Sequence, residues 1–236
     1  MKKIFLFAAA AIAALTVNAT VYDLNSMAFL QSDLIVTGGT ITDNASKSYF
    51  EIKNNAGETV VLTTPLLPHI EFSYKNSSEK TAFKVYYYTE GVNTKGKIQM
   101  DGNQRDVTIK NVTPGDKIVL WVNSKGDTGA QFADNDKGTA FTGAIVVDPS
   151  AAGIGTPLPG KANETDMYPI ELTAYSDVVV IRETVGGYIL HKIEIGQSQD
   201  IENTNAEVKT IKRYENGQLV IIKNGVKYNA LGAVIE

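Results

Sequence analysis

Cysteine is absent from this chain of 236 residues. Without cysteine the chain has no disulfide and no site for a lipoprotein anchor. A chain of this length is large enough to form one sizeable core by side-chain packing alone. The fold therefore depends on the burial of apolar residues and not on covalent cross-links.

Long apolar runs are also missing, with one exception at the N-terminus. Ile4–Leu15 is apolar, follows Lys2 and Lys3, and leads to a small-residue cleavage site at Val17–Ala19. The run is shorter than the roughly 20 residues of a membrane helix, so we expect a signal peptide at residues 1–19 and a secreted or outer-surface protein. Because eukaryotic secreted domains commonly carry disulfides, an exported chain without cysteine favours a bacterial source.

Histidine is scarce, with only His69 and His191 in the chain. No G-x-S-x-G, H-E-x-x-H or phosphate-binding loop is present. The strand pattern places His191 on the same face as Ile189, Ile193 and Ile195. A histidine there is more typically hydrogen-bonded and partly buried than a ligand or base. An enzyme would have to rely on a pair of carboxylates, as glycosidases do. The candidates near expected strand ends are Glu71, Glu90, Asp101 and Asp106.

Basic residues are outnumbered, 22 Lys and Arg against 26 Asp and Glu, which gives a formal net charge of −4. Loss of Lys2 and Lys3 with the signal peptide removes two positive charges and makes it −6. An acidic surface disfavours nucleic acid and anionic membranes as partners.

Apolar and polar residues alternate on both sides of a turn in the stretch 105–124. The turn is Thr113–Asp116, where Pro114 presets φ and Gly115 accepts the positive φ of a type II turn. The pattern predicts a β-hairpin. The residues expected to face the core are Val107, Ile109, Ile118, Leu120 and Val122.

Similar signals predict two further hairpins along the chain. One joins Tyr49–Lys53 to Thr59–Thr64, and the other joins Asp177–Arg182 to Gly187–Ile195. Strands recur roughly every 8 to 12 residues, as in an antiparallel β-sandwich or barrel, and no helix pattern follows the signal peptide. We therefore expect an all-β antiparallel sandwich at residues 20–196.

The C-terminal region has a different composition. Residues 197–207 are polar and predict a linker, and residues 208–236 contain three short strand patterns. These patterns are Val208–Arg213, Gln218–Lys223 and Val226–Asn229.

The order of TPGDKIVLWVNS and, much later, DVVVIRETVGGYILHKIEIG resembles the jelly-roll modules of secreted Bacteroidetes proteins. The resemblance covers roughly residues 20–196 and concerns the strand pattern. Modules of this kind occur beside polysaccharide-degrading domains and are often taken to bind glycans. The resemblance thus implies a jelly-roll sandwich and a polysaccharide or cell-surface glycan as partner.

The tail YENGQLVIIKNGVKYNALGAVIE is similar to a shortened type IX sorting domain of the same bacteria. The shared order runs from Asn216-Gly217 through an apolar strand to Asn224-Gly225, then Tyr228-Asn229 and Leu231-Gly232. This similarity implies that residues 208–236 are recognised by an export machinery. Alternatively, because Asn-Gly pairs favour type I′ turns, the tail is only a small hairpin packed on the sandwich.

Aromatic residues supply the main binding hypothesis. If the expected core residues of their strands face inward, Trp121, Tyr86 and Tyr88 face outward. Outward rings on neighbouring strands would form an apolar platform for a sugar ring, with Lys84 and Asn123 available for its hydroxyls. In the alternative, another layer covers the rings and they belong to an ordinary core.

The segment 134–138 resembles part of a calcium loop, because Asp134 and Asp136 alternate as oxygen ligands. It has Gly138 at the fifth place and no glutamate at the twelfth, so a polar turn is the favoured interpretation and no cofactor is expected.

Three functions remain open on the sequence. The favoured one is an exported, non-catalytic glycan-binding or surface-adhesion module. The first alternative is a polysaccharide hydrolase or lyase that uses carboxylates. The second is a structural spacer at the cell surface that binds no small ligand.

Overall fold

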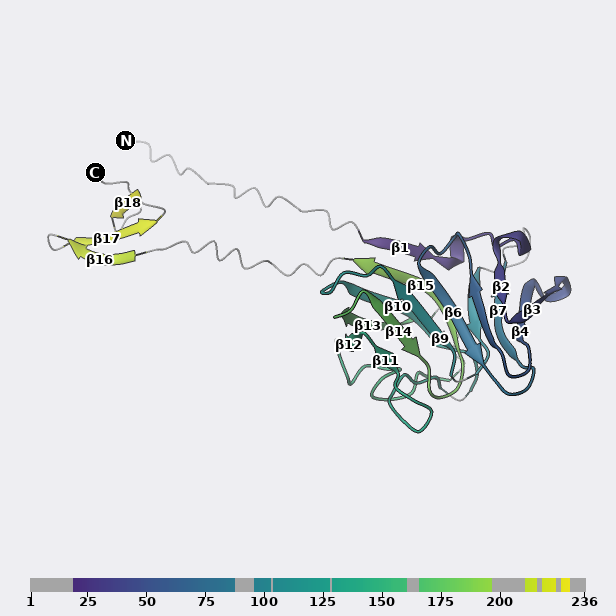
Figure 1. Ribbon diagram of the computed structural model, residues 1–236. Coiled ribbons are helices and arrows are strands. Elements are labelled where there is room, and N and C mark those ends of the chain that lie inside the picture. The colour runs from purple at the N-terminus through teal and green to yellow at the C-terminus, as the bar shows by residue number, and fades with distance from the viewer. Residues whose placement is uncertain are drawn as a thin grey trace. The chain divides into compact units, whose positions relative to one another are not determined.

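The computed structural model describes residues 19–87, 96–102, 104–127, 129–160 and 166–196, together with the backbone of 211–215, 218–223 and 226–229. The chain divides into two compact units, residues 1–198 and 199–236. In the first unit two antiparallel sheets pack as a sandwich, which confirms the predicted all-β class (Figure 1).

The larger sheet has nine strands in the order β12-β13-β10-β15-β8-β7-β4-β3, with β1 also pairing with β15. Its strands are β1 (Thr20–Asp23), β3 (Gly39–Asn44), β4 (Tyr49–Asn54), β7 (Thr81–Tyr86), β8 (Lys97–Met100), β10 (Lys117–Ser124), β12 (Ala144–Val146), β13 (Tyr168–Ala174) and β15 (Tyr188–Gly196).

The smaller sheet has six strands in the order β11-β14-β9-β6-β5-β2. Its strands are β2 (Ile35–Thr37), β5 (Thr59–Thr63), β6 (Ile70–Lys75), β9 (Asp106–Lys110), β11 (Phe141–Thr142) and β14 (Val178–Arg182). Helical structure among the described residues consists of η1 (Leu24–Ser26), η2 (Gln31–Asp33) and η3 (Ala45–Lys47). None of these short helices could cross a membrane.

The core between the two sheets follows the predicted alternation. Val107 and Ile109 of β9 are fully buried, and so are Ile118, Leu120 and Val122 of β10. All five belong to the hydrophobic core cluster, which confirms their predicted inward orientation.

The predicted hairpins, in contrast, are wrong. β9 lies in the six-stranded sheet and β10 in the nine-stranded sheet, so the two strands do not pair. Residues 111–116 connect one sheet to the other. The expected turn does form: Asp116 N–H donates to the Thr113 carbonyl at 2.9 Å, and Gly115 has φ 99°. The pairs β4–β5 and β14–β15 are divided between the sheets in the same way. An apolar face can be buried by a facing sheet, and alternation does not say which sheet a strand joins.

At each side of the sandwich one segment passes between the sheets at a glycine. β2 continues through Gly38 into β3, and β11 continues through Gly143 into β12 (Figure 1). The φ angles are 66° and 80°, and a Cβ at either position would lie 2.1 Å from the carbonyl oxygen of Thr59 or Val178. Both crossings therefore require glycine for backbone conformation and for space.

In the second unit, β16 (Ile211–Glu215), β17 (Gln218–Lys223) and β18 (Val226–Asn229) form a three-stranded antiparallel sheet. The predicted signal peptide up to residue 18 and the predicted linker 197–207 lie outside the described residues.

Candidate functional site

The predicted ligand residues that the structure describes share one surface, the outward face of the nine-stranded sheet. Trp121 and Asn123 lie on β10 and alternate with the core residues Leu120 and Val122. Lys84 and Tyr86 lie on β7 and alternate with the core residues Phe83 and Val85. Tyr88 lies outside the described residues. β15 and β8 lie between these two strands in the sheet. The four side chains therefore share one face of the sheet but do not form a single cluster.

The Trp121 ring is partly covered by its neighbours on β15. Its Nε1–H donates to Oε1 of Glu194 at 3.1 Å, and Nζ of Lys192 lies 4.6 Å from the ring centroid. A half-buried ring with a cation over it offers less apolar surface for sugar stacking than a bare one.

Tyr86 is embedded in a similar network. Its hydroxyl donates to Oε1 of Gln99 at 3.2 Å, Lys97 Nζ lies 4.9 Å from its ring centroid, and the Tyr49 ring packs beside it at 5.2 Å. Gln99 Nε2 in turn donates to Asp101 at 2.8 Å.

Lys84, the remaining predicted residue of β7, contacts the same network. Its Nζ lies 3.7 Å from Asp101 and 5.3 Å from the Tyr49 ring centroid. Burial of Asp101 opposes its ionisation, but the hydrogen bonds from Lys125 and Gln99 and the charges of Lys125 and Lys84 together outweigh burial and lower the Asp101 pKa. This face is thus a cross-strand network of paired polar groups.

His191 marks an irregularity in this face. A β-bulge shifts the β10–β15 register, so that Trp121 opposes Lys192 and Val122 opposes Leu190. The bulge places Ile193 in the core while His191 stays on the outer side with Asn123, and the predicted common face of His191 and Ile193 is wrong for this reason. His191 Nε2 lies 3.2 Å from Oδ1 of Asn123, and its Nδ1 lies 3.3 Å from Oδ1 of Asn25. Asn123 is therefore buried and engaged with the protein.

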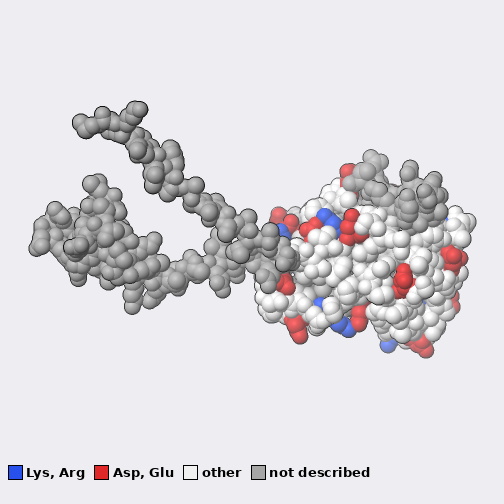
Figure 2. Space-filling model, turned by 90° about the horizontal axis from the view of Figure 1, so that it is seen from above, with Lys and Arg blue, Asp and Glu red and all other residues white. Residues whose placement is uncertain are grey.

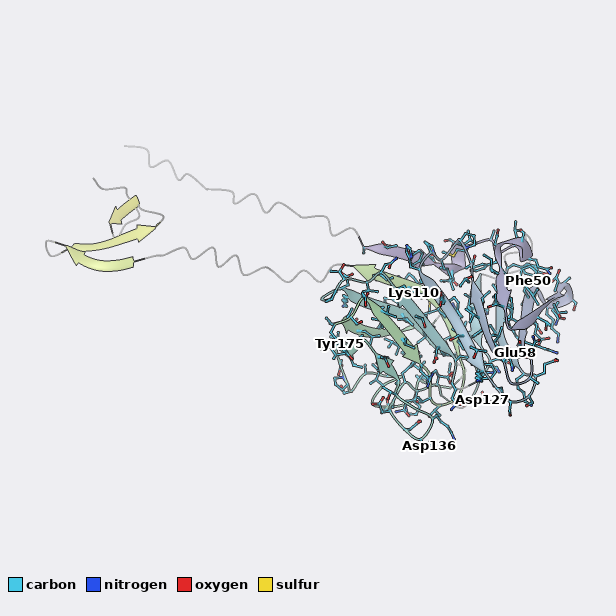
Figure 3. All side chains as sticks on the ribbon, viewed as in Figure 1. Phe50, Glu58, Lys110, Asp127, Asp136 and Tyr175 are labelled. Carbon is cyan, nitrogen blue, oxygen red and sulfur yellow. The ribbon has the colours of Figure 1, made fainter. Side chains whose placement is uncertain are left out.

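The predicted calcium ligands lie in an exposed loop, with Asp136 at its tip (Figure 3). Asp134 Oδ1 accepts a hydrogen bond from the Ala140 N–H at 2.8 Å, and Asp136 forms an ion pair with Lys137. Asn135 and Gly138 close the loop through two backbone hydrogen bonds. The residues that the structure describes contain no group of three His, Asp or Glu side chains able to hold a metal.

Each described carboxylate that was considered for catalysis contacts a cation. Glu71 pairs with Lys110, and Asp101 lies between Lys84 and Lys125. Glu90 lies outside the described residues. The fourth acid, Asp106, belongs to a hollow on the opposite sheet.

This hollow lies on the outward face of the six-stranded sheet and has a volume of about 370 Å³. It is open and mainly polar, and it is lined by Thr59, Ser73, Tyr74, Lys75, Gln104, Asp106 and Arg182.

The strand register assembles the hollow from four neighbouring strands. Arg182 of β14 opposes Asp106 of β9, which opposes Ser73 of β6. One step along the sheet, Lys75 of β6 opposes Thr59 of β5. Hydroxyl, amide, carboxylate, guanidinium and ammonium groups therefore meet at one end of this sheet.

The Arg182–Asp106 pair is the fixed centre of the hollow. The guanidinium donates from Nε and Nη2 to the two carboxylate oxygens at 2.6 and 2.7 Å. This bidentate geometry raises the Arg182 pKa and holds both side chains in place.

Gln104 forms one wall of the hollow. Its φ of 64° lies in the left-handed region, and its backbone N–H donates to the Glu183 carbonyl at 2.9 Å. Its Nε2 donates to the Lys137 carbonyl at 3.3 Å. Positive φ is unfavourable for a residue with a side chain, so these two hydrogen bonds hold Gln104 in this conformation. The position of this wall is therefore fixed by the surrounding structure.

Behind the hollow lies a buried polar group of residues. The guanidinium carbon of Arg105 lies 3.8 Å from the Tyr74 ring centroid, and Arg105 donates to the carbonyls of Thr81 and Ala82. Glu183 is fully buried, and neither carboxyl oxygen has a hydrogen-bond partner in the described structure. Burial raises the Glu183 pKa to about 9 against the opposing charges of Arg105 and Lys125.

Sequence patterns did not identify the hollow as a site. Its residues come from segments 59, 73–75, 104–106 and 182, and no local motif joins them. The outward position of Ser73 was visible in the alternation of β6, but the pairing of β6 with β9 and β14 was not.

No protein-family model matches this chain, and a search of curated proteins finds no match.

Proposed function

We propose that this chain is an exported, non-catalytic glycan-binding or surface-adhesion module of jelly-roll type, and that the hollow at Arg182 and Asp106 is its ligand site. The observation that carries the proposal is the mixture of groups lining the hollow. Sugar hydroxyls both donate and accept hydrogen bonds, and the hollow offers cationic donors, a carboxylate acceptor, an amide and the two aliphatic hydroxyls of Thr59 and Ser73 in one place.

A rigid strand framework supports this function. Thr59, Ser73, Asp106 and Arg182 all lie on strands of one sheet, so ligand binding requires little ordering of the chain. Binding sites with preorganised polar groups lose less conformational entropy when a flexible polysaccharide docks.

The alternative of a carboxylate-dependent hydrolase or lyase has less support. Glycosidases need two carboxyl groups across the scissile bond, about 5 to 10 Å apart. Asp106 is the only acid among the described residues that line the hollow, and both of its oxygens accept hydrogen bonds from Arg182.

For residues 208–236 we propose the role of an export address. The similarity to a shortened sorting domain supports it, and the three-stranded sheet gives a receptor a folded element to recognise. Deletion of residues 208–236 should then retain the protein inside the cell, whereas secretion of the truncated chain would show that the tail has no address function.

A glycan array tests the binding proposal with residues 20–236 and two variants. Gln104→Gly removes one wall of the hollow, and glycine suits the φ of 64°, so the fold should be preserved. Trp121→Ala alters the opposite sheet and serves as the control. We expect glycan binding that is lost in Gln104→Gly and retained in Trp121→Ala.

Binding that is retained in Gln104→Gly and lost in Trp121→Ala would show that the site lies on the Trp121 face of the nine-stranded sheet. Absence of binding to every plant, host and microbial glycan would contradict the proposal and leave the spacer function. Thermal unfolding of both variants establishes that any loss is not a loss of folding.

A further inference from the structure

The hollow carries an excess of positive charge in a chain that is acidic as a whole. Its lining contains two cations, Lys75 and Arg182, and one acid, Asp106. The formal net charge of the chain is −4. Figure 2 shows one face of the first unit, on which acidic and basic side chains are scattered without a large patch of one sign. The local positive balance of the hollow therefore contrasts with the negative net charge of the chain.

Lys75 is the cation of the hollow that no described carboxylate neutralises. It is exposed at the end of β6, and among the described residues no carboxylate lies within ion-pair distance of its Nζ. Lys110, which lies at the other end of the same sheet face, forms an ion pair with Glu71. An unpaired ammonium beside a hollow is available to a ligand anion.

Arg182 has donor capacity beyond its bond to Asp106. A guanidinium has five N–H donors, and the two bonds to Asp106 use one from Nε and one from Nη2. Its side chain is 35% exposed. Its Nη1 has no acceptor among the described residues and lies near Gly138, where a Cβ would approach it to 3.0 Å. Arg182 therefore presents further donors while Asp106 fixes its plane.

The other lining groups suit a sugar rather than a bare anion. Ser73 and Thr59 contribute hydroxyls, Gln104 contributes an amide oxygen, and Asp106 contributes acceptor lone pairs. A site for a simple anion would be lined by donors, whereas this site combines donors for a carboxylate with acceptors for hydroxyls. The hollow's two cations and one acid, in an acidic chain, are also too little positive charge for nucleic acid.

We propose that the hollow binds the carboxylated sugar units of an acidic polysaccharide, with the ligand carboxylate at Lys75 and Arg182 and its hydroxyls at Asp106, Gln104 and Ser73. This inference rests on the proposed glycan-binding function and specifies its ligand class.

Isothermal titration tests the inference with residues 20–236 and matched sugars. The acidic probes are oligosaccharides of galacturonate and of hyaluronan, and each is paired with the same oligosaccharide after reduction of its carboxyl groups. We expect the acidic form to bind at least about tenfold more tightly than the reduced form. We also expect its affinity to fall when the ionic strength rises from about 0.15 M to about 0.5 M.

Two charge variants locate the effect within the protein. Lys75→Gln should weaken binding of the acidic probe about five- to tenfold and leave the reduced probe unaffected. Lys110→Gln makes the same charge change on the same sheet face, outside the hollow, and should change neither affinity (Figure 3).

The outcomes separate this inference from the function on which it rests. Equal or tighter binding of the reduced probes, or an unchanged affinity in Lys75→Gln, would overturn the acidic ligand class and leave glycan binding intact. Polyglutamate is titrated as a non-sugar polyanion. If it binds more tightly than every sugar probe, the ligand class is an acidic peptide and the proposed acidic polysaccharide is wrong. Absence of binding to both forms of both sugars, together with a negative glycan array, would overturn the proposed function itself.

Discussion

Arg182 and Asp106 lie opposite each other on β14 and β9 and form two parallel hydrogen bonds across the strands. The carboxylate side chain is 17% exposed and the guanidinium side chain 35% exposed, so the pair is only partly screened by water. Asp106 and Arg182 are far apart in the sequence, and the pairing of β9 with β14 brings them together.

Asp106→Asn should lower the free energy of unfolding by about 1 to 2 kcal/mol, because a charge-assisted pair becomes a neutral contact beside a partly buried cation. Urea unfolding measures the loss, and a double-mutant cycle with Arg182→Gln isolates the coupling. A coupling below about 0.3 kcal/mol would show that the pair contributes nothing beyond an exposed surface ion pair.

Glu183 should give the protein an unusual pH dependence. Its pKa is about 9 in the folded state, against an ordinary value of 4.5, so the folded state keeps the proton that the unfolded state loses. Stability contributed by this proton is complete below pH 4.5 and declines as the pH rises towards 9, with a slope of up to about 1.4 kcal/mol per pH unit.

Glu183→Gln should remove this slope, since the amide does not titrate. Urea unfolding of both proteins at a series of pH values from 5 to 8.5 measures the difference, and the exposed Glu58→Gln is the matched control (Figure 3). A stability difference between wild type and Glu183→Gln that stays constant with pH would contradict a protonated Glu183.

Gly143→Ala should be severely destabilising, because the crossing between β11 and β12 needs both a positive φ and space for a carbonyl. We expect a cost above about 3 kcal/mol, of which the positive φ accounts for about 1. Gly57→Ala is the control, since Gly57 also has a positive φ, of 80°, but a Cβ there meets no atom within 4 Å. Thermal unfolding measures the loss of stability in both variants. Equal losses would contradict the prediction, because they would show that the backbone accommodates a Cβ beside the Val178 carbonyl without strain.

The sequence predicted the buried faces of the strands but not their partners. Val107, Ile109, Ile118, Leu120 and Val122 were identified as core residues from alternation, which depends only on the side-chain period of a strand. The division of β9 and β10 between sheets depends on residues 111–116 and on distant strands, and no local pattern encodes it.

The site shows the same limit. Trp121 and Tyr86 were predicted to face outward and do so, but their covering by Lys192 and Lys97 depends on the β10–β15 and β7–β8 pairings. The hollow could not be predicted because Lys75, Gln104 and Arg182 come together only after β6, β9 and β14 have paired.

Chemical-shift mapping tests the central claim most directly. Residues 20–236, labelled with ¹⁵N, are titrated with galacturonate oligosaccharides, and the backbone amide shifts of both sheets are followed. The account predicts that the shifts concentrate at Ser73, Lys75, Gln104, Asp106 and Arg182 and leave Trp121 and Tyr86 unchanged. Shifts concentrated at Trp121 and Tyr86, or no shifts with any acidic glycan, would contradict it.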